Sequence, residues 1–338
     1  MDQGTRRVTI ADVAEKAGVS KTAVSFAFNS PDRLNTATAN RILEIATALG
    51  YRPDPVARML SQRRTAAIGV LTPQALSVIF TNPFFAAFSA GIAGVAEEQG
   101  YGLHFISPLH GSLSNAIHRA TVDGVVAIGL TDDHPEIDEI RRAGLPMVLV
   151  DSNTAGEVAS VDIDDEGGAR LAAQHVIDLG HREVAILAID GPQPAGGDDE
   201  GVVARRLRGY RETLAAAVVA GRASIEGGAS AFERAWAAGR RPTAVLAMSD
   251  AMAVGVMGVA RELGLRVPDD LSVVGFDDVD LAAHVDPPLT TVHQPIRRKG
   301  SDAARLLLAA VERPEASPPE HRRLETRLVV RGSTAPQP

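Results

Sequence analysis

Two charged residues stand where an α/β protein commonly binds a small molecule. Asp277 directly follows the apolar run Ser272–Phe276, and open parallel sheets bind ligands at the carboxyl ends of their strands. Arg206 lies at the start of an expected helix, where its planar guanidinium can hold a pair of hydroxyls or a carboxylate. For an Asp after a strand, capping of the next helix is the alternative role. Two further residues are weaker candidates of the same kind, namely Asp151 and Asp162.

Sequence motifs for catalysis and for metal binding are absent from the chain. No G-x-G-x-x-G follows the first apolar run, and G-x-x-x-x-G-K-S/T, G-x-S-x-G and H-E-x-x-H do not occur. The chain has no cysteine, and its 9 His are scattered, which excludes disulfides and thiolate metal sites and does not suit a zinc pattern. We therefore expect no catalytic residues, no metal and no cofactor.

The elements that must position these residues alternate between short apolar strands and amphipathic helices. The expected strands are Ala66–Leu71, Gly102–Ile106, Gly124–Ile128, Met147–Val150, Val184–Ile189, Ala244–Met248, Ser272–Phe276 and Leu328–Val330. The expected helices are Pro83–Gln99, Ile137–Ala143, Glu166–Leu179, Arg206–Val219, Ala251–Gly264 and Pro295–Val311. Continuous apolar strands between helices predict parallel sheets covered on both faces. Because the pattern restarts near residue 165, the fold class is α/β with two similar lobes.

A different pattern comes before this α/β region. Apolar residues at helical spacing predict a first helix, namely Ile10, Val13, Ala14 and Ala17. Thr9 stands at its N-cap and Gly18 ends it, and Ser20 then caps a second helix, Lys21–Phe28. Two short helices joined by a turn of about three residues form a helix-turn-helix, whose second helix enters the DNA major groove. An ordinary helical hairpin in a protein core is the alternative.

Charge favours the DNA-binding interpretation. A third helix follows, capped by Asn35 and closed by Gly50, and then a segment bounded by proline with Arg58, Arg63 and Arg64. Residues 1–64 hold 10 Lys+Arg and 6 Asp+Glu, a net charge of +4, whereas the remaining residues hold 24 and 36, a net charge of −12. A basic head on an acidic body is typical of a nucleic-acid-binding module joined to a second function.

The chain resembles the lac repressor / purine repressor family of bacterial transcription regulators over essentially its whole length. In the head the matching strings are VTIADVAEKAGVS (8–20), VSFAFN (24–29), ALGYRPDPVARML (48–60) and IGVL (68–71). In the rest they are TNPFF (81–85), VDGVV (122–126), LGHREVAIL (179–187), RLRGY (206–210), MSDAMAVG (248–255), VPDDLSVVGFDD (267–278), PPLTTVHQP (287–295) and LVVRGST (328–334). The resemblance implies a periplasmic-binding-protein-like body with ligand between its lobes, in which GFDD and TTVHQP mark crossings of the chain between lobes.

The resemblance also implies two sets of site residues. The expected DNA-binding residues are Thr9, Ser20, Lys21, Thr22, Ser25, Phe26, Asn29, Arg58 and Leu60, with Leu60 as a wedge in the minor groove. Packing of Leu60 against the body is the alternative. The expected effector-binding residues are Phe84, Phe85, Asp151, Asp162, Arg206, Ser249, Asp277 and Gln294, of which one Phe is expected to be core.

The sequence departs from the family pattern at a few positions. Phe26 replaces a usual Arg and Ala23 a frequent Thr on the recognition helix, so the base sequence that it reads is open. Ala229 and Ile296 stand where sugar-binding members often place an aromatic residue for stacking. A pocket poor in aromatic residues weakens the expectation of a sugar ligand without replacing it.

Three segments of the chain are expected. Residues 1–52 form the helix-turn-helix domain, 53–65 a hinge that becomes helical on DNA, and 66–338 a two-lobed domain for effector binding and dimerisation. The N-lobe spans about 66–160 plus part of 295–325, and the C-lobe about 165–290 plus the C-terminal strand. The lobe bounds 66–160 and 165–290 follow from the strand–helix pattern in the sequence, whereas the hinge and the assignment of the C-terminal segments to the lobes are what the family resemblance implies.

The function expected is that of a ligand-responsive repressor of transcription. Its partners would be a pseudo-palindromic double-stranded DNA operator, a carbohydrate or nucleoside effector, and a second copy of the chain. Because no apolar segment of about 18 residues occurs and MDQGTRRVTI lacks a signal-peptide pattern, we expect a soluble, cytoplasmic protein without a membrane partner. A solute-binding protein or a sugar-processing enzyme with the same body is the alternative, but neither has a use for the basic head.

Overall fold

The computed structural model describes residues 8–54, 59, 64–154, 156–190, 201–239, 241–313 and 318–337. The chain divides into two compact units, Met1–Thr65 and Ala66–Pro338, called here the head and the body. The described part of the head is helical. Its elements are α1 (Ile10–Ala17), α2 (Lys21–Asn29), the short 3-10 helix η1 (Pro31–Arg33) and α3 (Thr36–Ala48).

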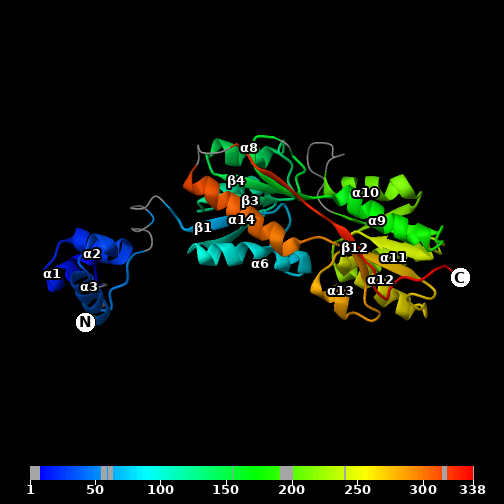
Figure 1. Cartoon of the computed structure of the whole chain (residues 1–338), viewed down its shortest axis with the longest axis horizontal. Coiled ribbons are helices and arrows are strands. Elements are labelled where there is room, and N and C mark those ends of the chain that lie inside the picture. The colour runs from blue at the N-terminus through cyan, green and yellow to red at the C-terminus, as the bar shows by residue number, and fades with distance from the viewer. Residues whose placement is uncertain are drawn as a thin grey trace. The chain divides into compact units, whose positions relative to one another are not determined.

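The body contains two six-stranded sheets with helices on both faces (Figure 1). The strands of the first half are β1 (Ala67–Leu71), β2 (Gly102–Ile106), β3 (Gly124–Ile128), β4 (Met147–Val150) and β5 (Ser160–Ile163), with helices α5 (Leu76–Ile79), α6 (Pro83–Glu98), α7 (Leu113–Arg119) and α8 (Pro135–Arg142). The strands of the second half are β6 (Val184–Ile189), β7 (Ala217–Gly221), β8 (Ala244–Ala247), β9 (Ser272–Asp277) and β10 (Thr290–His293), with helices α9 (Asp165–Asp178), α10 (Val202–Thr213), α11 (Ile225–Ala237), α12 (Asp250–Glu262) and α13 (Asp280–His284). The chain then adds α14 (Ile296–Glu312), β11 (His321–Leu324) and β12 (Arg327–Val329).

The two sheets have the same strand order and define two lobes. The N-lobe sheet runs β11-β5-β4-β3-β1-β2, and the C-lobe sheet runs β12-β10-β9-β8-β6-β7. All neighbours are parallel except β10 and β12, which pair antiparallel. Since β4 and β9 occupy the same place in their sheets, residues that follow these two strands are structural counterparts. This parallel architecture confirms the α/β prediction.

Along its described residues, the body crosses between the lobes three times. It passes from β5 to α9, from β10 to α14, and from β11 to β12, the last as the red strand in Figure 1. The second passage contains TTVHQP, as expected. The expectation for GFDD was wrong, because β9 is followed by α13 and both belong to the C-lobe, where β9 pairs with β10.

The helix expected at 206–219 was also wrong at its C-terminal half. Helix α10 ends at Thr213, and Ala217–Gly221 forms β7. The alanines of the local run AAAVVA favour a helix, but its two β-branched valines favour a strand. Strand β7 pairs in parallel with β6 from Ala185↔Ala217 to Ile189↔Gly221. Pairing with β6 therefore decides a segment whose local propensity is mixed. The short elements β5, β10, β11, α5, α7 and α13 have too few residues for a reliable periodic pattern.

Two helices of the N-lobe pack with their backbones in contact. Helices α6 and α14 lie side by side (Figure 1). A Cβ atom added to Gly91 of α6 would lie 2.1 Å from the carbonyl oxygen of Arg297, and one added to Gly300 of α14 would lie 2.2 Å from that of Phe88. Only glycine fits at either position, so these two residues determine how close α14 comes to α6.

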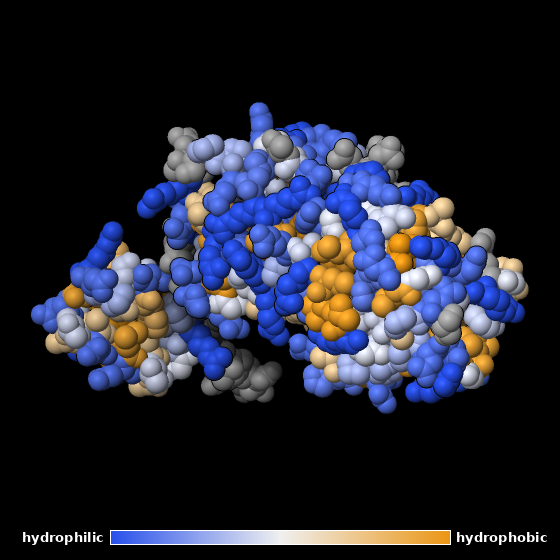
Figure 2. Space-filling model, turned by 45° about the vertical axis from the view of Figure 1, so that its right-hand side comes forward, coloured by the Kyte–Doolittle hydropathy of each residue, from blue (hydrophilic) through white to orange (hydrophobic). Residues whose placement is uncertain are grey.

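The surface is mostly hydrophilic, with an apolar area on the lobe that carries the C-terminus (Figure 2). Among the described residues, Phe80 and Val330 are the most exposed of the larger hydrophobic side chains, at 66 % and 58 %. Among the described residues, no helix is long and apolar enough to cross a membrane.

Candidate functional site

The head forms the two helices and the turn that its sequence predicts. The Thr9 backbone N–H and hydroxyl both donate to Asp12 Oδ2, at 2.8 and 2.7 Å, and Gly18 ends α1 in the left-handed region at φ 65°. The Ser20 hydroxyl accepts from the Ala23 N–H at 3.1 Å and caps α2. Asn35 caps α3 in the same way, through the N–H of Ala37. The turn between α1 and α2 is therefore fixed by caps on both sides.

The first turn of α2 offers polar side chains to a partner. Lys21 and Thr22 are exposed, Ser25 and Phe26 are half-buried, and Val24 is buried in the head's core. Asn29 Nδ2 donates to Ser25 Oγ at 3.4 Å. The Arg33 guanidinium lies 5.3 Å from the centre of the Phe26 ring, which places a cation over the residue that departs from the family pattern. Arg58 and Leu60, both named as expected DNA contacts, lie outside the described residues.

The body contains a cavity of about 630 Å³ between the carboxyl ends of the two sheets. Thr72, Ile128 and Asp151 line it from the ends of β1, β3 and β4, and Ile189, Ser249 and Asp277 from the ends of β6, β8 and β9. Helix α10 contributes Arg206, Arg208 and Arg211, and α6 contributes Phe84 and Phe85. Parallel sheets place ligand sites at this edge, and here both sheets supply one wall.

Six of the eight expected effector-binding residues line this cavity, and two do not. Those that do are Phe84, Phe85, Asp151, Arg206, Ser249 and Asp277. Gln294 lies behind the wall and donates from Nε2 to Asp277 Oδ1 at 2.6 Å. Asp162 does not line the cavity, and its carboxylate accepts from Ser160 Oγ at 2.7 Å and from the Asn153 N–H at 2.7 Å.

The capping alternative stated for Asp277 fails, whereas Ser249, expected only as a ligand contact, also caps a helix. Asp277 does not cap α13, whose N-cap is Val279 without a side-chain bond, and its φ of 121° is a strained value for a residue with a side chain. Its counterpart Asp151 also has a positive φ, 59°. Ser249 accepts from the Met252 N–H at 3.3 Å and so caps α12 while it faces the cavity.

Two arginines at the start of α10 are held by one buried carboxylate. Asp165 accepts from Arg205 Nη2 at 2.7 Å and from Arg206 Nε at 2.9 Å, and all three side chains are buried. Arg206 Nη1 also donates to the Met248 carbonyl at 2.6 Å, and its guanidinium lies 3.6 Å over the Phe276 ring. Burial alone would raise the pKa of Asp165, but Arg206, Arg205 and Lys299 outweigh it, and the pKa is lowered.

A chain of polar contacts connects the two cavity carboxylates. Lys299 Nζ donates to Asp151 Oδ1 at 2.7 Å and to Gln294 Oε1 at 2.6 Å, and Gln294 donates on to Asp277. Burial raises the pKa of Asp277 to about 7, against the opposing effects of Arg206, Gln294 and Lys299. Burial and the nearby Asp277 also raise the pKa of Asp250 well above its usual range, although Thr291 and the Val279 N–H donate to its carboxylate.

Sequence reasoning missed Asp165, Arg205 and Lys299. Asp165 belongs to one of several Asp pairs that resemble helix caps, and its neighbour Asp164 is such a cap, accepting from the Gly167 N–H at 3.1 Å. Lys299 had a signal in the composition, because it is the single lysine after residue 64.

The two positions at which an aromatic residue was expected to stack on a sugar, Ala229 and Ile296, do not line the cavity. Ala229 lies in α11, packed against α12 at Gly255, and does not line the cavity. Ala223, in the loop between β7 and α11, does line it. Ile296 is buried at the start of α14 and belongs to the core.

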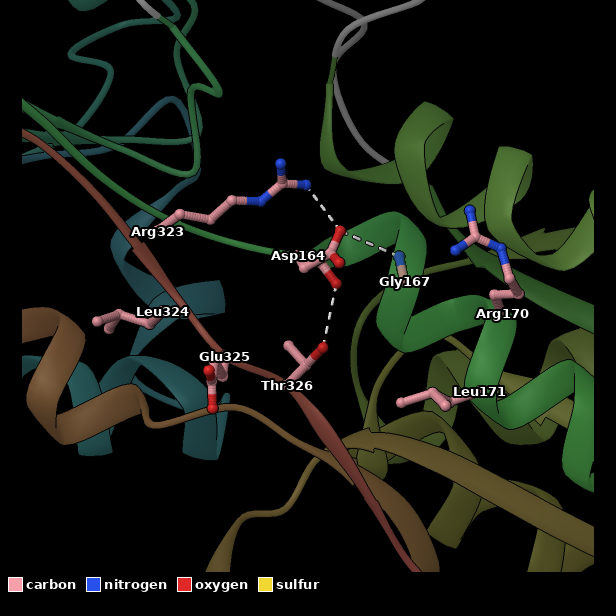
Figure 3. Close-up of a pocket in the computed structure, with 8 residues that line it drawn as sticks. All are labelled: Asp164, Gly167, Arg170, Leu171, Arg323, Leu324, Glu325 and Thr326. Carbon is pink, nitrogen blue, oxygen red and sulfur yellow. Dashed lines mark hydrogen bonds and ion pairs between the residues drawn. The ribbon is translucent and has the colours of Figure 1, made fainter.

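A second hollow, of about 520 Å³, lies where the chain passes from β5 to α9 and from β11 to β12 (Figure 3). Arg323 Nη2 donates to Asp164 Oδ1 at 2.7 Å, and the Thr326 hydroxyl donates to the Asp164 carbonyl at 3.2 Å. Arg170 pairs with Glu212 and Glu166. Because these polar groups already bind one another, we assign the hollow to the contact between two crossing segments of the chain and not to a ligand site. In the part of the chain that the structure describes, no group of acidic or His residues is placed to hold a metal ion.

Comparison with known proteins agrees with both halves of this description. Residues 9–54 match the family described as bacterial regulatory proteins, lacI family, and residues 173–334 match a periplasmic binding protein-like domain. The chain is 34 % identical to the HTH-type transcriptional regulator CelR of Thermobifida fusca, over 97 % of this chain and 98 % of that protein. It is 33 % identical to the HTH-type transcriptional repressor PurR of Vibrio campbellii, over 90 % of this chain and 92 % of that protein.

Solved structures agree as well. The lac repressor dimer bound to operator and the anti-inducer ONPF has a TM-score of 0.80 at 28 % identity, over 98 % of this chain and all of that one. A CelR–cellobiose complex has a TM-score of 0.69 at 32 % identity, over 97 % of this chain and all of that one. The chain therefore belongs to the lacI family of bacterial regulatory proteins.

Proposed function

We propose that this regulator is a homodimeric repressor whose affinity for operator DNA is set by a neutral, hydroxyl-rich effector in the cavity between the lobes. One observation carries the proposal. A single chain combines a capped helix-turn-helix that exposes Lys21 and Thr22 with a two-lobed body whose cavity is lined from both sheets by Asp151, Arg206 and Asp277. As a regulator of transcription it acts on DNA in the bacterial cytoplasm.

On the DNA side, α2 is the recognition helix. Its exposed first turn carries Lys21 and Thr22, with Ser25 one turn further on, and these polar side chains suit contacts with base edges. Phe26 offers an apolar contact, for which a thymine methyl group is a suitable partner. Two heads related by the twofold axis of a dimer would read the two halves of a pseudo-palindromic operator.

On the effector side, two of the charged groups that line the cavity are already paired within the protein. Arg206 is paired with Asp165, and Asp151 is paired with Lys299. The pKa of Asp277, raised by burial to about 7, leaves this carboxyl partly protonated at neutral pH, so that it can both donate and accept hydrogen bonds. Sites built in this way favour uncharged ligands with several hydroxyls, such as a sugar or the ribose of a nucleoside.

Phe84 and Phe85 supply the aromatic surface that such a ligand needs. Their rings meet edge to face with centres 5.4 Å apart, and Phe84 stacks on Phe88 at 6.1 Å. Phe85 is nearly buried, so Phe84 is the one we assign to stacking against the ligand. CelR was solved with cellobiose and related regulators with ribose, which supports the carbohydrate class.

A solute-binding protein or a sugar-processing enzyme with the same body is the competing interpretation. Neither class of protein needs a DNA-binding helix-turn-helix. The relatives CelR and PurR are transcriptional regulators, which are not enzymes. The two cavity carboxylates, Asp151 and Asp277, are joined through Gln294 and Lys299 instead of standing free as an acid and a base.

A thermal-shift screen of neutral sugars, sugar acids and nucleosides tests the effector class. A ligand at one hundred times its dissociation constant stabilises the folded state by about 2.7 kcal/mol, which is readily measured. We expect neutral carbohydrates or nucleosides to raise the Tm, and Arg206→Ala and Asp277→Ala to abolish that shift while DNA binding persists in the state that needs no ligand. A ligand that still stabilises both variants as it does the parent chain would place the effector elsewhere.

A further inference from the structure

Lys299 is an exceptional residue in the composition of the body. After residue 64 the chain has 24 Lys+Arg, of which 23 are Arg and one is Lys299. Its side chain is 0 % exposed, whereas most arginines of the body reach solvent. A buried ammonium is costly unless it is paired and hydrogen-bonded. Lysine differs from arginine in presenting a compact point charge with three donors instead of a flat fork.

The partners of the ammonium come from both sides of the cleft. Asp151 follows β4 in the N-lobe, and Lys299 Nζ lies 2.7 Å from its Oδ1. Gln294 lies in the crossing from β10 to α14, accepts from Lys299 at 2.6 Å and donates to Asp277 of the C-lobe at 2.6 Å. The Phe84 ring centre is 5.4 Å from Nζ. One cation therefore holds, directly or through one amide, a carboxylate from each lobe.

The backbone of Lys299 cannot shift easily. It lies on the first turn of α14, between Arg297, whose carbonyl touches α6 at Gly91, and Gly300, which touches α6 at Phe88. Since the helix is clamped on both sides of this residue, the ammonium is delivered to a fixed point behind the cavity wall.

We propose that Lys299 is a positioning residue of the effector site, whose charge holds Asp151 of the N-lobe and Asp277 of the C-lobe in one network across the cleft. The proposal rests on the proposed function only in that it treats the cavity as the effector site. The other charged and titratable groups around the two carboxylates are Arg205, Arg206 and Tyr210 from α10, Asp162 and Asp165, Asp250 from α12, and Asp278.

The first experiment observes the ammonium in the unliganded full chain. The sequence has three lysines, Lys16, Lys21 and Lys299, and the first two are exposed. Protein labelled with ¹⁵N-lysine should therefore show one slowly exchanging ammonium signal at neutral pH, which disappears in Lys299→Met. Asp151→Asn should move that signal, and Lys16→Met should leave it in place. Rapid exchange of all three ammonium groups would overturn the network.

The second experiment uses pH as the probe. Lys299→Met keeps the length of the side chain but removes the cation that contacts Asp151 and one of the two cations that favour the charged form of Asp277, the other being Arg206. The ionised form of each carboxyl is therefore less stable in the variant. We expect the Tm deficit of Lys299→Met to grow from pH 5 to pH 8. Lys299→Arg, which keeps the charge in a larger group, should show a deficit that does not grow with pH.

A double variant separates charge from packing. Asp151→Asn in the Lys299→Met background removes both members of the ion pair. Part of the Tm that Lys299→Met loses at high pH should therefore be recovered. A deficit of the same size at every pH, unchanged by Asp151→Asn, would assign Lys299 a packing role and refute the proposal. None of these experiments uses an effector. A negative result in them would therefore refute the role of Lys299 without touching the proposed regulator function, and a thermal-shift screen without hits would leave their results intact.

Discussion

Arg206 Nε lies 2.9 Å from Asp165 Oδ1, and this buried ion pair joins the N-terminal half of α10 to the first turn of α9. The same carboxylate holds Arg205 through its other oxygen at 2.7 Å. An arginine that faces a ligand cavity is thus oriented before any ligand arrives. Preorganisation of this kind reduces the entropy that binding must overcome.

Asp165→Asn should be strongly destabilising. The change leaves two buried guanidinium groups with an uncharged partner, and removal of one member of a buried ion pair typically costs about 3–5 kcal/mol. Because the pKa of Asp165 is lowered in the folded state, its contribution is present above the pKa of the unfolded chain and is lost as the pH falls through the folded value. Urea unfolding of the variant near neutral pH measures the loss.

Glu166→Gln is the matched control for that change. Glu166 is the next residue of α9 and also pairs with two arginines, Arg170 at 3.4 Å and Arg208 at 3.3 Å, but at the surface. Exposed ion pairs contribute about 0–1 kcal/mol, so the control should lie close to the parent chain. Equal losses in the two variants would contradict the view that burial makes the Asp165 pair important.

The pH dependence of stability should contain a component from Asp277. Its folded-state pKa of about 7 exceeds the ordinary value of 3.8 because of burial, against the effects of Arg206, Gln294 and Lys299. A carboxyl whose pKa is raised on folding contributes stability below the unfolded pKa and loses it as the pH rises to the folded one. Stability should therefore fall between pH 4 and 7 by more in the parent chain than in Asp277→Asn.

Guanidinium unfolding at half-unit pH steps measures this difference. Two other buried carboxyls, Asp162 and Asp250, also have raised pKa values and remain in both proteins, so only the difference between the two curves reports on Asp277. Parallel curves over this range would mean that Asp277 ionises as an ordinary carboxyl does.

Gly91→Ala should disturb the joint between α6 and α14, and Gly94→Ala should not. A Cβ at Gly91 would lie 2.1 Å from the Arg297 carbonyl oxygen, whereas a Cβ at Gly94, one turn along the same helix, meets nothing within 4 Å. We expect the first change to cost about 1–3 kcal/mol through overpacking. The second removes a flexible glycine from a helix and should stabilise by about 0.5–1 kcal/mol.

Thermal melts of the two glycine variants give the comparison directly. The ammonium signal of Lys299 offers a second readout, because displacement of the first turn of α14 should alter it in Gly91→Ala alone. Tolerance of alanine at Gly91 without any change in Tm would show that the two helices can separate freely.

Lys21→Ala and Ser25→Ala should weaken specific DNA binding. The two side chains lie on the first turns of the recognition helix, and loss of a good base contact costs about 1–3 kcal/mol and relaxes preference at that base pair. An operator selected from random DNA provides the substrate, and affinities for its single-base variants give the base preference. Lys16→Ala, an exposed lysine at the end of α1, removes the same charge and should lower affinity without a change in base preference.

The sequence by itself determined the elements that rest on local rules. Thr9, Gly18, Ser20 and Asn35 start or end helices of the head through bonds within a few residues, so the helix-turn-helix could be placed from the order of residues alone. Long apolar strands such as Val184–Ile189 were equally plain, because a strand buried on both faces is apolar throughout. The family resemblance rested on these same segments.

The tertiary structure decided the elements and contacts that depend on distant residues. Ala217–Gly221 became a strand because β6 offered it an edge, whereas its local propensity, with two alanines beside two valines, is mixed. Asp162 faced Ser160 instead of the cavity, and Asp165 met Arg205 and Arg206 some 40 residues away. Lys299 joined Asp151 across 148 positions of sequence. Charges are paired by folding and not by spacing, because a buried charge must find its partner wherever the chain brings one.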